Sequence, residues 1–295
     1  MTWGKNRWFD SWICEVTEWF ESLFYKPCSN DLGHGISIII PFRKSKKYPR
    51  QERNFEFVKK YWRCQLPGAE IIVGHDPERH KTFSKSVAIN RAVRRSHGDI
   101  LVIVDADGYI TPQAVLHCAA EIRQARAEGL RLWFVPYRQF YRLTEAASDR
   151  ILASDPCGPF QQTCPPNPDD VQNTSGSGRG HWYGALIQIM PREAFDCFGG
   201  WDKRFRGWGG EDHSAMRACD TMYWRHKTLP GCVFHLWHPM YGIDGVNTWV
   251  DWNKRLWDNQ KDVVSGYNGN LAARYSRANG NREKMWRLIQ EQEIE

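Results

Sequence analysis

The sequence lacks any long apolar run and any recognisable secretory leader. No stretch approaches the ~20 consecutive apolar residues that a membrane-spanning helix needs. Near the N-terminus, the acidic residues Asp10, Glu15, Glu18 and Glu21 interrupt the apolar ones, which is not typical of a signal peptide. These absences predict a protein without a membrane span, located in the cytoplasm.

A disulfide framework is also missing from the pattern. The nine cysteines are odd in number and are spread over 295 residues, whereas disulfide-rich secreted domains are short and carry an even number of closely spaced cysteines. The cysteines are therefore predicted to be reduced thiols, several of them buried, namely Cys14, Cys118 and Cys219.

Strong charge of either sign is absent as well. Charged residues make up 25% of the chain and the net charge is +6, which indicates a globular protein and slightly favours anionic partners such as nucleotides or nucleic acid. The fifteen tryptophans are unusual in number. Most are expected in the core, and some have the flat apolar face that stacks on a sugar or a nucleobase.

Apolar and acidic residues alternate at helical spacing over residues 5–25, where Trp8, Trp12, Trp19 and Leu23 share one face. This pattern predicts an amphipathic helix. Its apolar face would dock on the rest of the domain or on a second copy of the chain, so a homo-oligomer is expected through this helix.

From residue 36 onward, strand-like and helix-like segments alternate. Strands are predicted over residues 36–42, 69–76, 99–107 and 130–140. Helices are predicted over residues 53–65 and 84–96, between Thr111 and Gly129, and near the C-terminus over 247–264 and 281–293. Such alternation is typical of an α/β fold with a mostly parallel, doubly wound sheet. Ligands bind at the carboxyl ends of such strands, where Arg43, Asp76, Asp105 and Asp107 fall.

The segment "LVIVDADGYITP", residues 101–112, ends a buried strand with two carboxylates one residue apart. One interpretation is a site for Mg²⁺ or Mn²⁺, which bind carboxylate oxygens and neutralise a diphosphate leaving group. A second is a haloacid-dehalogenase-type phosphatase, with Asp105 as nucleophile and Asp107 as acid and base. A third is a pair of aspartates that cap the following helix. The motif alone does not distinguish these three.

Its surroundings argue against the phosphatase. In phosphatases of that type the motif lies on the first strand, whereas here two strand–helix units precede it, and the later acidic loop of those enzymes has no convincing counterpart. Residues 182–212 read "WYGALIQIMPREAFDCFGGWDKRFRGWGGED", and "IIIPFR", "FSKSVAINRAV" and "VFHLWHP" lie at residues 38–43, 83–93 and 233–239.

Together with Asp-Ala-Asp, these segments resemble, in order, the catalytic domain of β-1,4-galactosyltransferases. Related forms occur in polypeptide N-acetylgalactosaminyltransferases and bacterial chondroitin-type polymerases. The resemblance implies a GT-A fold, which is Rossmann-like with a mostly parallel central sheet flanked by helices, here with added N- and C-terminal helices. The resemblance runs from about residue 36 to 240 and leaves the ends of the chain outside it. With the predicted helices, we expect an N-terminal amphipathic helix over 1–32, a catalytic domain over 33–245 and a C-terminal helical extension over 246–295. Within the catalytic domain, 33–140 would bind the nucleotide sugar, and 141–245 would bind the acceptor and carry a flexible loop over 154–182.

The resemblance assigns roles to individual positions. Asp107 is expected to bind the metal directly, together with His238 or His235, and Asp105 is expected to contact the ribose or the metal through water. A zinc site that adds Cys232 to the two histidines would lack a fourth ligand. Glu211 would hold sugar hydroxyls and Asp212 would act as the base.

The remaining positions concern the donor. Expected donor contacts are Pro41, Arg43, Asp76, Lys85, Trp208, Gly209 and Gly210. Asp212 is asparagine in the retaining relatives, so an inverting mechanism is favoured, while His213 and Ser214 depart from the galactosyltransferase form.

The resemblance thus implies a metal-dependent glycosyltransferase that uses a UDP-sugar and Mn²⁺ or Mg²⁺. The acceptor is a hydroxyl group on a glycan, a protein side chain or a modified DNA base; enzymes that glycosylate DNA bases occur in phages. A sugar- or nucleotide-binding module without catalysis remains the alternative from another class. It would keep the aromatic residues and the two strand-tip aspartates but would have no need of Asp212.

Overall fold

The computed structural model describes residues 32–46, 48–78, 82–176, 186–207, 209–239 and 266–294. The amphipathic helix predicted over 5–25 and the helix predicted over 247–264 lie outside these ranges, as does Trp208. The strands are β1 (Ile36–Pro41), β2 (Glu70–Gly74), β3 (Ile100–Val104), β4 (Gly108–Tyr109), β5 (Phe134–Val135), β6 (Gln139–Leu143), β7 (Val171–Gly176), β8 (Ile187–Pro191), β9 (Lys227–Thr228) and β10 (Cys232–His235). The helices are α2 (Pro49–Gln65), α3 (Lys85–Val93), α4 (Pro112–Ala127), α5 (Glu145–Ala153), α6 (Arg192–Cys197), α7 (Glu211–Met222), α9 (Gly266–Ala278) and α10 (Arg282–Ile294), with a 3₁₀ turn at Pro168–Asp170.

A six-stranded sheet in the order β2-β1-β3-β8-β5-β9 forms the centre of the molecule. Strands β1, β2 and β3 pair in parallel, and every residue of β1 and β3 is buried, as expected for strands covered on both faces. Strand β8 runs antiparallel between β3 and β5. The predicted α/β sheet is therefore confirmed, with one antiparallel strand that the sequence pattern did not indicate.

A second sheet carries part of the site. Its four strands have the order β4-β10-β6-β7. The single strand predicted over 130–140 is in fact two: β5 belongs to the central sheet and β6 to the second. Pro136 lies between them and cannot donate a hydrogen bond to a ladder, which gives a reason for the break. The chain likewise passes from the central sheet to the second one between β3 and β4.

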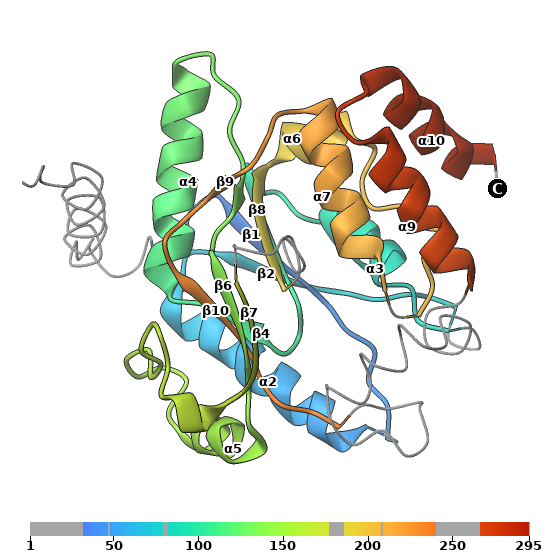
Figure 1. Ribbon diagram of the computed structural model, residues 1–295. Helices are drawn as coiled ribbons and strands as arrows, with labels where there is room; N and C mark the ends of the chain where they lie inside the picture. The colour runs from blue at the N-terminus through green and yellow to red at the C-terminus, as the bar shows by residue number, and fades with distance from the viewer. Residues whose placement is uncertain are drawn as a thin grey trace, which may run out of the picture.

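Helices cover both faces of the central sheet (Figure 1). Helix α4 stands on one side, and α3, α6 and α7 lie on the other, with α9 and α10 packed outside α7. Helices α2 and α5 lie beneath the second sheet as drawn. The helix predicted over 281–293 is confirmed as α10, whereas α9 was not predicted. Trp62, Trp133 and Trp201 are fully buried, in agreement with the expectation that many tryptophans are core.

The Pro- and Gly-rich stretch that begins at residue 154 contains more structure than its composition suggests. After the 3₁₀ turn, β7 pairs antiparallel with β6, so a strand occupies part of the predicted loop 154–182. Residues 177–185 lie outside the described residues. Phe160 packs against Tyr61, Tyr109 and Phe234, which fixes the first part of the stretch on the aromatic core between α2 and the second sheet.

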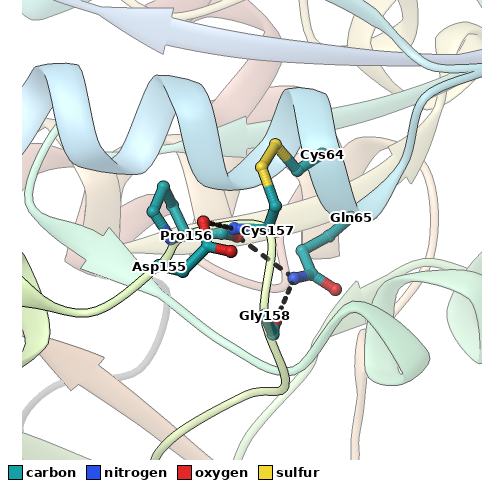
Figure 2. The surroundings of a disulfide bond; sticks show 6 residues. All are labelled: Cys64, Gln65, Asp155, Pro156, Cys157 and Gly158. Atoms are coloured by element: carbon teal, nitrogen blue, oxygen red, sulfur yellow. Dashed lines mark hydrogen bonds between the residues drawn. A yellow bond between two sulfur atoms is a disulfide. The ribbon is translucent and has the colours of Figure 1, made fainter.

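Two disulfides also hold this stretch. Cys157 is bonded to Cys64 on α2, and Cys164 to Cys232 on β10. Gln65, next to Cys64, donates from its amide nitrogen to the carbonyl oxygens of Pro156 and Gly158 (Figure 2). The prediction that the cysteines are reduced thiols is therefore wrong for these four, because residues far apart in sequence meet only after folding.

Three other described cysteines agree with that prediction. Cys118, Cys197 and Cys219 are free, and Cys118 and Cys219 are buried; Cys14 lies outside the described residues. Disulfides persist in oxidising compartments and are rare in the reducing cytosol, so the two pairs argue against the cytoplasmic location expected from the sequence. Among the helices that the structure describes, none combines the length and apolar character of a bilayer-crossing segment.

The Cys64–Cys157 bond closes a loop of 93 residues, so removing it should increase the conformational freedom of the unfolded chain considerably. We expect the double variant Cys64→Ser/Cys157→Ser to lose about 2–4 kcal/mol of unfolding free energy, measured by urea denaturation of the full chain. The matched control is Cys197→Ser, which removes a half-buried free thiol. Equal midpoints for the double variant and the parent protein would show that this bond contributes no stability.

Candidate functional site

The strand-tip aspartates are separated by a sharp change of direction. After β3, the Asp105 amide donates to the carbonyl oxygen of Leu186, and the Gly108 amide donates back to the Asp105 carbonyl at 3.1 Å. Gly108 then enters the second sheet opposite His235. A side chain at Gly108 would press against Leu186 at 3.1 Å. This turn directs the two carboxylates to different partners.

Asp107 lies with two histidines of the β10 region. The ligating atoms of Asp107, His235 and His238 all lie within 4.8 Å of one another. One carboxylate oxygen of Asp107 is 3.2 Å from Nε2 of His238 and 3.8 Å from Nε2 of His235. Asp105 is not part of this cluster. The structure thus brings together three of the four predicted metal ligands, including both histidines between which the sequence did not decide.

The donor set of this cluster fits a divalent cation. Nδ1 of His238 lies 2.9 Å from the carbonyl oxygen of Pro239, which can only accept, so Nδ1 carries a hydrogen and Nε2 faces Asp107. This pairing of a ring N–H with a backbone carbonyl is typical of metal-binding histidines. Burial and the nearby Arg142 lower the pKa of His235 to about 3, although Asp107 opposes the shift, so the ring of His235 is neutral at neutral pH.

The electrostatics keep Asp107 ionised. Burial by itself would raise the pKa of Asp107, but the two histidines and Arg142 outweigh it and hold the pKa below its usual range. A carboxylate and two imidazoles are ligands that transition metals accept readily. Mg²⁺ prefers oxygen ligands, so this set favours Mn²⁺ over Mg²⁺.

Asp105 points towards a buried lysine. Nζ of Lys85 lies 2.6 Å from Asp105 and 3.6 Å from Glu211, and 5.3 Å from the centre of the Trp201 ring. Burial would lower the pKa of Lys85, but Asp105, Glu211 and Asp212 raise it well above its usual value, so the ammonium stays charged. Lys85 therefore joins the tip of β3 to the start of α7.

Glu211 and Asp212 occupy the first turn of α7, where the helix dipole favours negative charge. Gly210 precedes them with φ +89°, and a Cβ there would lie 2.8 Å from Cβ of Ala272 on α9, so this position requires glycine. Gly209 also has a positive φ, of 109°, and its amide donates to Glu211 at 3.2 Å. The two glycines thus form the turn that presents the acidic pair.

The two acids differ in their surroundings. Burial and the charge of Asp212 raise the pKa of Glu211, with Lys85 opposing the rise. Burial would raise the pKa of Asp212 as well, but His213 and Lys85 lower it below its usual value. The His213 backbone amide donates to Asp212 at 2.7 Å, and Nδ1 of the same residue lies 3.1 Å away. Asp212 is therefore an oriented, ionised carboxylate, and Glu211 is the acid that holds its proton more strongly.

The predicted donor contacts Arg43 and Asp76 meet at the carboxyl ends of β1 and β2. Arg43 donates to Asp76 at 2.8 Å and lies over the Phe83 ring at 5.1 Å. The side chain of Asp76 is fully buried and also accepts from the backbone amides of Glu78 and Ser84. Asp76 thus holds the start of α3 and orients Arg43. Pro41 ends β1 beside Gly74 of β2.

Residues that the sequence analysis did not single out complete the charge pattern. Arg142 on β6 is buried near Asp107, Asp105 and Asp212, and burial lowers its pKa to about 10 although these carboxylates oppose the shift. Arg206 lies 3.7 Å from Asp76. Arg142 is a charged residue between the apolar neighbours Tyr141 and Leu143 of β6, and this pattern could have indicated a functional role from the sequence. Arg206 lies in a loop and gave no such signal.

The contribution of the Lys85 ammonium to stability can be tested by substitution. Replacing this lysine by methionine leaves Asp105 and Glu211 buried without their cation, and breaking a buried ion pair costs about 3–5 kcal/mol. The pKa of both acids then rises, so the folded protein binds protons more strongly than the unfolded chain, and the loss should shrink as the pH falls. We expect Lys85→Met to show a large deficit in urea denaturation at pH 8 and a smaller one at pH 5.5.

The matched control is Lys227→Met, because Lys227 is 62% exposed and pairs with Glu121; an exposed pair of this kind contributes less than about 1 kcal/mol. A deficit in Lys85→Met that is no larger than that of Lys227→Met, or that does not change with pH, would contradict the buried ion-pair account.

Residues 78–153, which include both strand-tip aspartates, match the family model described as Glycosyl transferase family 2. No curated protein matches the chain.

The solved structures that match this chain are distant in sequence. One is the catalytic domain of Drosophila beta1,4galactosyltransferase 7 in complex with xylobiose, with 16% identity and a TM-score of 0.36 over 66% of this chain and 64% of that one. Another is S. aureus TarS, with 14% identity and a TM-score of 0.41 over 68% of this chain and 36% of that one. A third is mannosyltransferase PcManGT from Pyrobaculum calidifontis in complex with GDP-Man and Mn2+, with 13% identity and a TM-score of 0.40 over 97% of this chain and 94% of that one. The match to this family model, over about a quarter of the chain, supports glycosyltransferase activity.

Proposed function

We propose that the chain transfers a sugar from a UDP-sugar to a hydroxyl acceptor, with Mn²⁺ bound by Asp107, His235 and His238 and with Asp212 as the base of an inverting reaction. The observation that carries this proposal is the position of Lys85. Its ammonium contacts Asp105, beside the candidate metal cluster, and Glu211, beside the candidate base. A donor held by the first group would therefore lie next to the second.

The donor end of the site is assigned to the edge formed by β1, β2 and α3. Arg43 and Lys85 provide cationic groups that would bind a diphosphate. The Phe83 ring under Arg43 offers a flat apolar surface on which a nucleobase would stack. Pro41 and Asp76 shape this edge, and Asp105 is placed to bind the ribose. When bound, the cation neutralises charge on the diphosphate leaving group. Gly209 and Gly210 leave room for a sugar to approach the backbone.

Asp212 has the features of a general base. Its carboxylate is ionised at neutral pH and is oriented by two contacts from His213. In the proposed step, the acceptor oxygen forms a bond to the anomeric carbon, the bond from that carbon to the diphosphate oxygen breaks, and the diphosphate leaves with the electron pair. The acceptor's proton passes to Asp212. Glu211, which holds its proton more strongly, is suited to hydrogen-bonding sugar hydroxyls.

The proposed acceptor is a hydroxyl on a glycan, a protein side chain or a modified DNA base. Lys85 and Arg142 lie near the two acids and favour an acceptor that tolerates a charged surface. Oligomer formation through the N-terminal helix stays a prediction, because residues 1–31 lie outside the described part of the chain.

The proposal is tested by measuring UDP release and sugar transfer with a panel of UDP-sugars and acceptors, in Mn²⁺ and in EDTA. We expect activity that EDTA abolishes. Asp212→Asn should lower transfer about 10²–10⁴-fold, the usual contribution of a general base, while Mn²⁺ binding is retained. Glu211→Gln is the matched control, since it neutralises the neighbouring acid in the same helical turn and should affect KM more than kcat.

Other results would overturn parts of the proposal. A larger kcat loss in Glu211→Gln than in Asp212→Asn would make Glu211 the base. Transfer with retention of the anomeric configuration would exclude the inverting mechanism. Hydrolysis of simple phosphomonoesters without any effect of UDP would favour a phosphatase, and binding of UDP-sugars without transfer to any acceptor would favour a binding module.

A further inference from the structure

The chain between the two histidines is held in an unusual way. Strand β10 ends at His235, and the next amide, of Leu236, donates to the carbonyl oxygen of Asp107 at 2.7 Å. At Trp237, both backbone groups then bind side chains instead of a neighbouring strand. Its N–H donates to Oγ of Ser148 at 2.8 Å. Its carbonyl oxygen accepts from Nε of Arg50 at 3.1 Å and from Nδ2 of Asn54 at 3.0 Å.

These three side chains, which we name the Trp237 clamp, are deeply buried. Ser148 and Asn54 are 0% exposed and Arg50 is 8% exposed. Arg50 and Asn54 are one turn apart on α2 and so share a face, whereas Ser148 comes from α5. Arg50 also pairs with Asp149 and lies 5.2 Å from the centre of the Trp237 ring. Buried polar groups are costly unless they are paired, and this cluster directs its polar groups to one peptide segment.

The clamp has a direct geometric consequence for the two imidazoles. In a continued strand, residues three apart point to opposite faces of the sheet, so His235 and His238 would diverge. Because the chain leaves the strand after His235 and is held at Trp237, the two rings instead approach to 5.1 Å between centroids. Both then lie within 3.8 Å of the same oxygen of Asp107.

We propose that Ser148, Asn54 and Arg50 are positioning residues for the metal site: they hold the Trp237 peptide so that His238 completes a cluster with Asp107 and His235. This inference rests on the proposed function only in taking that cluster as the Mn²⁺ site. It adds α2 and α5 to the set of elements that determine metal affinity. Groups that orient metal ligands typically contribute 10–100-fold to affinity.

The test measures Mn²⁺ affinity of the full chain without donor or acceptor, from the electron paramagnetic resonance signal of free Mn²⁺. We expect Ser148→Ala and Asn54→Ala each to weaken binding about 10–100-fold. The matched control is Ser96→Ala. Ser96 is also a buried serine with a hydrogen-bonded hydroxyl, which donates to the carbonyl oxygen of Val93 and accepts from Arg192, but it follows the C-terminal end of α3 and takes no part in the Trp237 clamp. Its loss should lower stability without changing Mn²⁺ affinity.

A double-mutant cycle separates positioning from general loosening. If Ser148 acts through His238, then Ser148→Ala should cost little further Mn²⁺ affinity in a His238→Ala background. An equal loss in both backgrounds would overturn the proposal, as would unchanged Mn²⁺ affinity in folded Ser148→Ala and Asn54→Ala. A parent protein that binds no Mn²⁺ would overturn the proposed metal site itself, which distinguishes the two failures.

Discussion

The candidate site depends on one buried ammonium group. Lys85 occupies the first position of α3, where the helix dipole disfavours a cation. The position is stabilised because Asp105, Glu211 and Asp212 raise the pKa of Lys85 from two other elements. Without that cation, the tip of β3 and the start of α7 would place like charges together in a buried space. The lysine therefore allows a metal-binding edge and an acidic helix start to share one site.

A second constraint is the fixation of β10 at both ends. Cys232, at its start, is bonded to Cys164, and Trp237, just beyond its end, is held by side chains from α2 and α5. Between these points the strand pairs with β4 and β6. Strand β4 directly follows Asp107, and β6 contains Arg142. The histidines are thus supported by several parts of the chain that are far apart in sequence.

In each part of the site, the pKa values of two neighbouring acids are shifted in opposite directions. Around Asp107 the two histidines and Arg142 favour an ionised carboxylate, while burial raises the pKa of Asp105 to about 6 even though Lys85 opposes the shift. At α7, Asp212 is kept ionised and Glu211 holds its proton more strongly. Neighbouring acids with pKa values pushed apart in this way are a common arrangement where one acid acts as a base and another donates hydrogen bonds.

The sequence by itself determined the α/β alternation and the strand that ends at Asp105 and Asp107, because periodicity and turn chemistry are local properties. The glycines before Glu211 and the two histidines became candidates through the resemblance to galactosyltransferases. Only the tertiary structure decided which groups meet. It paired Asp105 with Lys85, brought both histidines to Asp107, added Arg142, and joined cysteines that the sequence indicated as free thiols. Those contacts span from 20 to more than 120 residues, for example 20 between Lys85 and Asp105 and 128 between Asp107 and His235, and no local pattern encodes which distant side chains will share a buried volume.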